Sequence, residues 1–107
     1  MVKAELEHEV TGIVETILKE IMAARDYLHM EMKCENVENK KNYLKFAEEE
    51  IEHFQWLRQT YEKEKMAKYK ELMLNNAVTN MLMGSLDDWE ERLSRKISSE
   101  KEKLGMK

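Results

Sequence analysis

Apolar residues recur every three or four positions along most of this chain, the spacing of an α-helix with one buried face. The first such stretch predicts a helix over residues 4–34. Its apolar stripe consists of Leu6, Val10, Ile13, Ile17, Ile21, Ala24 and Leu28. The pattern breaks at residues 35–39, where Asn36 and Asn39 suit a helix end followed by a new N-cap.

A second helix is predicted over residues 40–83. Its stripe consists of Tyr43, Ala47, Ile51, Phe54, Leu57 and Tyr61. Such a helix would be about 65 Å long at 1.5 Å per residue, so we expect a kink or break at residues 64–66 or 75–76. Gly84 is expected to end it. A third helix is predicted over residues 85–104, with acids in its first turn and lysines in its last, the order that the helix dipole favours.

These patterns predict an all-α fold in a single domain spanning residues 1–107. The absence of proline and the 42 % content of apolar residues are typical of long helices that enclose a core. Two helices joined by a short turn form an antiparallel hairpin, with the third helix beside it. A chain this short buries only a modest fraction of its surface. We therefore expect two copies to dimerise and complete a four-helix bundle.

Charge and cysteine content exclude several classes of function. The net charge of −4, with both signs interspersed, argues against nucleic acid as a partner. The sequence contains no apolar run long enough for a membrane span and no signal-peptide pattern. Cys34 is the only cysteine, which excludes an internal disulfide and a paired-cysteine zinc site. The cytoplasm is therefore the default expectation for its location.

The candidate chemistry lies in the second helix, where Glu50-x-x-His53 places a carboxylate and an imidazole one turn apart on the same face. Pairs of such motifs build dinuclear metal sites in helical bundles. The spacing alone is weak evidence, because the same spacing occurs at Glu5 and His8. A solvated surface pair is the simpler interpretation of any one such motif. Glu50 differs because it falls within an apolar stripe, where an unpaired carboxylate is costly.

A matching acid in the first helix strengthens the case. Glu20 also falls within an apolar stripe. If the first two helices fold back around residues 35–39, positions whose numbers sum to about 70–74 lie opposite each other. Glu20 then meets Glu50 and His53. Two copies of the chain would supply four glutamates and two histidines, the set that a carboxylate-bridged di-iron bundle uses. Manganese or another divalent metal is left open.

Glu20, the Glu50-x-x-His53 motif thirty residues later, and Tyr27 together resemble the encapsulated ferritins, short ferritin-like proteins related to half of a rubrerythrin bundle. The resemblance covers about residues 13–74. It implies a ferroxidase centre between two chains, with Glu20, Glu50 and His53 as metal ligands and catalytic residues and two irons per dimer. It also implies a homodimer, a ring-shaped decamer, and packaging in an encapsulin shell that stores the oxidised iron. Tyr27 would hydrogen-bond to the ligand carboxylates, although core packing explains it equally well.

Two other functions remain open from the sequence. One is a rubrerythrin-like peroxide reductase with the same metal site and a separate electron donor, because the chain lacks rubredoxin-type cysteines. The other is a helical oligomerisation protein without a metal. A second metal at His8, His29, Glu31 or Cys34 is not expected. Neither residues 83–86 nor residues 104–107 give a clear form of the family's targeting peptide.

Overall fold

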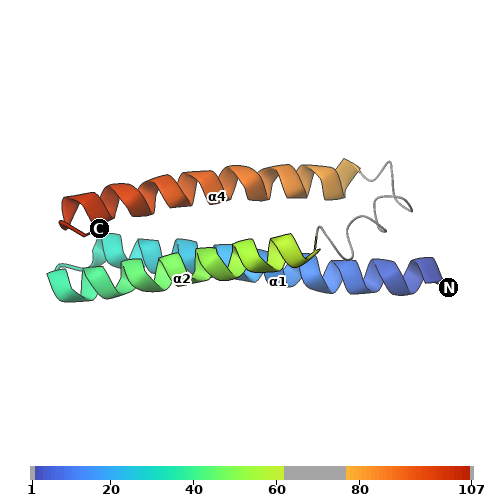
Figure 1. Cartoon of the computed structure of the whole chain (residues 1–107), viewed down its shortest axis with the longest axis horizontal. Coiled ribbons are helices and arrows are strands. Elements are labelled where there is room, and N and C mark those ends of the chain that lie inside the picture. The colour runs from blue at the N-terminus through green and yellow to red at the C-terminus, as the bar shows by residue number, and fades with distance from the viewer. Residues whose placement is uncertain (1, 62–76, 107) are drawn as a thin grey trace.

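The computed structural model describes residues 2–61 and 77–106, which form three α-helices (Figure 1). These are α1 (Val2–Lys33), α2 (Val37–Tyr61) and α4 (Ala77–Lys103). Helices α1 and α2 form an antiparallel hairpin, and α4 lies along it, parallel to α1 and antiparallel to α2. No strand occurs among the described residues, so the predicted all-α fold with a helical hairpin and a C-terminal helix is confirmed.

The turn between α1 and α2 is shorter than predicted, because α2 begins at Val37 and not near residue 40. The side-chain Oδ1 of Asn36 accepts a hydrogen bond of 3.0 Å from the backbone N–H of Asn39. This is the N-cap arrangement, in which a side chain satisfies an orphan donor of the first turn. Of the two asparagines that suited a cap, Asn36 is therefore the one that begins the helix.

The core lies where the three helices meet, and the stripes predicted for the described residues supply most of it. Fully or almost fully buried side chains come from every helix: Ile17, Ile21, Ala24, Leu28, Leu44, Ala47, Ile51, Phe54, Leu86 and Ile97. Among the members from α1 and α2, Leu44 is the one that the predicted stripes omitted, and it adds width to the buried face of α2. Burying a large aliphatic or aromatic side chain contributes about 1.5–3 kcal/mol, so this cluster dominates the stability of the bundle.

Helix α4 contradicts the predicted role of Gly84 as a helix end. Residues 77–83, which were assigned to the second helix, continue through Gly84 into the rest of α4 without a break. Gly84 is exposed, and its cost of about 1 kcal/mol relative to alanine is offset by the burial of Leu86 and Ile97 on the same helix. The predicted break at residues 64–66 or 75–76 lies outside the described residues.

Polar contacts fix α4 against α2 in antiparallel register. Lys101 bonds to Glu48 at one end, and Gln55 donates to Glu90 over 3.1 Å nearer the other end. Arg58 pairs with Asp87. Among the described residues, open hollows of about 230, 230 and 500 Å³ border α4 where it meets the hairpin. The third helix is therefore less closely packed against the hairpin than the hairpin helices are against each other.

The C-terminus of α4 ends in a Schellman motif. Gly105 adopts a left-handed backbone with φ of 70°. Its N–H bonds to the carbonyl of Glu102 over 3.1 Å, and the N–H of Met106 bonds to the carbonyl of Lys101 over 2.8 Å. Both bonds satisfy carbonyls that the helix end leaves free, and the left-handed position suits glycine. Leu104 and Met106 pack against the core, so this segment forms part of the fold.

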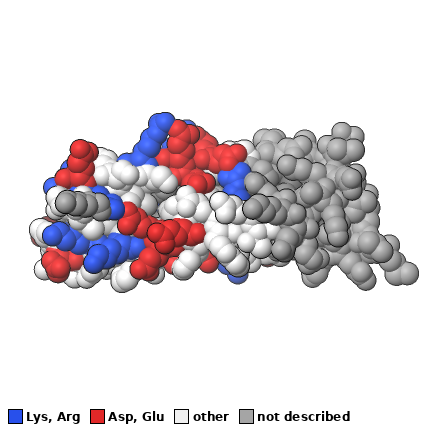
Figure 2. Space-filling view, in the orientation of Figure 1, with Lys and Arg blue, Asp and Glu red and all other residues white. Residues whose placement is uncertain are grey.

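Both signs of charge occur on the surface shown in Figure 2. Acidic side chains gather in two groups, one over α4 and one over α2, and basic side chains lie among and beside them. The described residues thus show no broad basic face on this side of the molecule. None of the described helices combines the length and the apolar character that a membrane span requires.

Candidate metal centre

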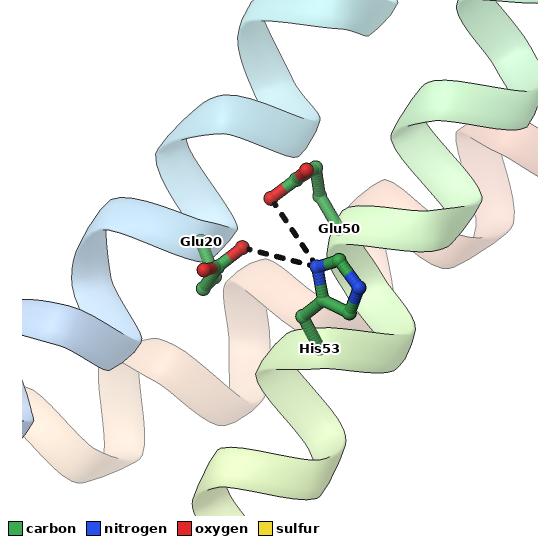
Figure 3. A group of neighbouring side chains, drawn as sticks. All are labelled: Glu20, Glu50 and His53. Carbon is green, nitrogen blue, oxygen red and sulfur yellow. Dashed lines mark ion pairs between the residues drawn. The ribbon is translucent and has the colours of Figure 1, made fainter.

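Glu20, Glu50 and His53 come together between α1 and α2 (Figure 3). Each offers one ligand atom, and these atoms all lie within 4.8 Å of one another. The Nδ1 of His53 lies 3.6 Å from a carboxylate oxygen of Glu20 and 3.9 Å from one of Glu50. The predicted register, which placed Glu20 opposite Glu50 and His53, is confirmed by these distances.

Helix geometry explains why the three side chains converge. Glu50 and His53 are three residues apart on α2, so they lie about one turn apart on the same face. Ala24 and Ala47 are completely buried in the hairpin, and their small side chains allow α1 and α2 to approach closely. Glu20 lies one turn before Ala24 on α1, at the edge of this contact. The hairpin register therefore positions all three groups without a loop.

The pKa of Glu50 is raised from 4.5 to about 7. The largest cause is a side-chain hydrogen bond with the carboxyl of Glu20, followed by burial and by the negative charge of Glu20; His53 opposes the shift. Two carboxyl groups in contact resist the loss of both protons, because the second negative charge would repel the first. A bound cation would remove this repulsion. These electrostatics thus match a site that binds positive charge.

The cluster is only partly enclosed. The side chains of Glu20 and Glu50 retain 26 % and 22 % of their accessible surface, and that of His53 retains 61 %. Helix α4 covers the flank of α2 that carries Glu48 and Gln55. With 3.6 residues per turn, Glu50 and His53 point to the other flank. Figure 3 shows this arrangement, with the ribbon of α4 behind the hairpin. The cluster therefore faces away from α4.

Tyr27 lies on the same side of α1 as Glu20, seven residues further along. Its ring contacts Phe46 of α2, with centroids 5.4 Å apart and planes inclined by 51°. In the described part of the chain, no hydrogen bond joins its hydroxyl to Glu20 or Glu50. Its position fits the packing alternative, and its proposed place around the metal ligands stays a prediction.

The other candidate ligands do not form a site. In the described part of the chain, no second group of three acidic, histidine or cysteine side chains lies close enough to share an ion. The side chains of Glu5 and His8 lie outside the description. Cys34 directs its thiol to the backbone of its own turn.

Glu31 has a structural partner that the sequence prediction missed. Its side chain is fully buried, and Lys40 Nζ bonds both to its carboxylate over 3.3 Å and to its backbone carbonyl over 2.9 Å. Glu31 lies three and seven residues after Leu28 and Ala24, so it continues the buried stripe of α1. That spacing could have identified it as a buried acid in need of a cation.

Comparison of the chain with protein-family models, with curated protein sequences and with solved structures gives no match. The cluster formed by Glu20, Glu50 and His53 is therefore the feature of this chain from which a function can be inferred.

Proposed function

We propose that two copies of this chain form a ferroxidase, which binds two irons between them and oxidises Fe²⁺ to Fe³⁺. The observation that supports this most is the convergence of Glu20, Glu50 and His53 from two helices within 4.8 Å. Carboxylates are hard anionic ligands that favour Fe³⁺ over Fe²⁺, and imidazole suits both states. Glu and His at this spacing on paired helices are the ligands that dinuclear iron bundles use.

A second copy is needed because the cluster is incomplete. Two carboxylates and one imidazole cannot fill the coordination of two irons, whereas two copies supply four carboxylates and two imidazoles. The side of the hairpin that carries the cluster also leaves apolar surface open to solvent: Phe46 is 43 % exposed and Met30 is 50 % exposed. Pairing two hairpins through this side would bury both residues and enclose the cluster.

The three side chains would perform distinct tasks. Glu50 would give up the proton it shares with Glu20 when metal binds, because the cation replaces the proton between the carboxylates. His53 would bind as the neutral imidazole. When two Fe²⁺ are bound, each can lose one electron to dioxygen, which takes up two protons and leaves as hydrogen peroxide. With peroxide as the oxidant, the same two electrons and two protons yield two waters. The oxidised iron would pass to an encapsulin-type store, since a chain this small cannot enclose a mineral.

An anaerobic titration of metal-free protein with Fe²⁺, followed by exposure to air, tests the proposal. We expect saturation near one iron per chain and a rise in near-ultraviolet absorbance from Fe³⁺ after oxygen is added. Glu50→Ala should abolish uptake, whereas Glu49→Ala is the matched control and should retain it, because Glu49 lies outside the cluster. Equal uptake by both variants would refute the site. Reaction with peroxide but not with oxygen would indicate the peroxide reductase.

A further inference from the structure

A groove between α1 and α4 lies away from the metal cluster and has a distinctive lining. Its volume is about 230 Å³, and its walls consist of Ile21, Met22, Arg25, Trp89, Arg92 and Leu93. Ile21 is buried, whereas Met22 and Trp89 remain 38 % and 40 % exposed. Tryptophan, methionine and arginine are the residues enriched where proteins bind one another. The composition therefore points to a docking surface.

The groove has an apolar end and a basic end. Met22 and Arg25 are three residues apart on α1, and Trp89 and Arg92 are three residues apart on α4. Because α1 and α4 run parallel, both apolar side chains lie one turn before both arginines along the groove. Arg25 and Arg92 pair with Asp26 at 3.6 Å and Asp88 at 3.0 Å. These exposed pairs contribute little, so either arginine can exchange its partner at small cost.

Helix α2 carries a surface with complementary features. Trp56 is 64 % exposed, the largest exposed fraction among the described large apolar side chains. Glu52 lies one turn before it and Glu49 two turns before it on the same face, and both are exposed. An aromatic side chain with an acid one turn away matches a groove whose apolar end lies one turn from two arginines.

We propose that the groove of one copy binds the Trp56 face of another copy. Trp56 would insert between Met22 and Trp89, and Glu52 would reach the two arginines. Since Glu52 precedes Trp56 while the arginines follow the apolar residues, the docked α2 runs antiparallel to α1 and α4. The contact joins two different surfaces, so it is heterologous and extends assembly beyond two copies.

This contact uses the outward face of α2, which is turned away from α1, whereas the proposed metal interface uses the flank that carries Glu50 and His53. Trp56 lies about 60° around the helix from His53, so it borders the metal interface without contributing a ligand to it. Sedimentation velocity of the metal-free chain over a range of concentrations measures how strongly copies assemble through this contact. Wild type should form species larger than a dimer. Trp56→Ala should lower the association constant of these species about thirtyfold, as expected for the central aromatic residue of an interface. Its iron uptake per chain should equal that of wild type, which separates failure of this contact from failure of the metal site.

A charge exchange tests the orientation. Glu52→Lys and Arg92→Glu should each weaken the larger species. A chain carrying both substitutions should restore them in part, because one pair of opposed charges is exchanged while Arg25 keeps its charge. All of these residues are exposed, so the variants should fold. Absence of species larger than a dimer in wild type, unchanged assembly in Trp56→Ala, or no restoration in the doubly substituted chain would each overturn the proposal.

Discussion

Replacing Glu50 with glutamine should stabilise the metal-free protein above pH 7. The pKa of Glu50 is 4.5 when unfolded and about 7 when folded, so between these values the folded state holds its proton more tightly. The free energy of unfolding of the wild-type protein therefore falls as pH rises from 4.5 to 7. At about 1.4 kcal/mol per unit, the full shift corresponds to about 3 kcal/mol. Solvent screening at this partly exposed site reduces that to about 1–2 kcal/mol.

Urea unfolding followed by circular dichroism at pH 5 and pH 8, with a chelator present, provides the assay. Glu50→Gln should match wild type closely at pH 5 and exceed it by about 1–2 kcal/mol at pH 8, which corresponds to roughly 5–10 °C in midpoint temperature. Glu35→Gln, in the exposed turn, is the control and should show no such gain. A variant less stable than wild type at pH 8 would refute the reasoning, since the charge on Glu50 would then be favourable in the folded protein.

Three further outcomes follow from the fold. Gly84→Ala should raise the free energy of unfolding by about 1 kcal/mol in thermal melts, because an added Cβ meets no atom within 4 Å and α4 is helical there; a loss of stability would contradict the continuous helix. Burial tends to raise the pKa of Glu100, but hydrogen bonds from Lys96 and Lys103 outweigh it and lower that pKa. Glu100→Gln should therefore cost about 1–2 kcal/mol at pH 7, and the difference should shrink as acid titration protonates Glu100 in the wild type. Phe54→Ala should cost about 3–5 kcal/mol in urea unfolding, because the ring is fully buried; a loss below 1 kcal/mol would show that the core is not packed as described.

The sequence was sufficient to predict the convergence of Glu20, Glu50 and His53, because it depends on two local quantities. Helical spacing places Glu50 and His53 on one face, and the length of the turn sets which residue of α1 lies opposite. The predicted start of α2 was three residues too late. Glu20 still faces Glu50 and His53 as predicted, because the register was set by the middle of residues 35–39 and not by the start of the helix. The distance of 3.6 Å between His53 and Glu20 confirms the result.

The position and limits of the third helix could not be predicted in the same way. Gly84 has a low helix propensity, and only tertiary contacts of residues such as Leu86 and Ile97 offset it. The flank of α2 that α4 covers depends on contacts such as Glu48 with Lys101, whose members are far apart in sequence. The sequence allows many alternative pairs of acids and lysines, so only the structure identifies the pairs that form.

The pairing of buried Glu31 with Lys40 has a consequence for the register of the hairpin. Sliding α2 along α1 by one turn would preserve much of the apolar contact, because both faces repeat at that interval. The same slide would move Lys40 away from the fully buried carboxylate of Glu31, and a buried carboxylate without its cation is far more costly than a lost methyl contact. Only nine residues separate the two groups, so the pair can form as soon as the turn closes. Contacts within the hairpin itself thus disfavour a misaligned register, without any contribution from the distant residues of α4.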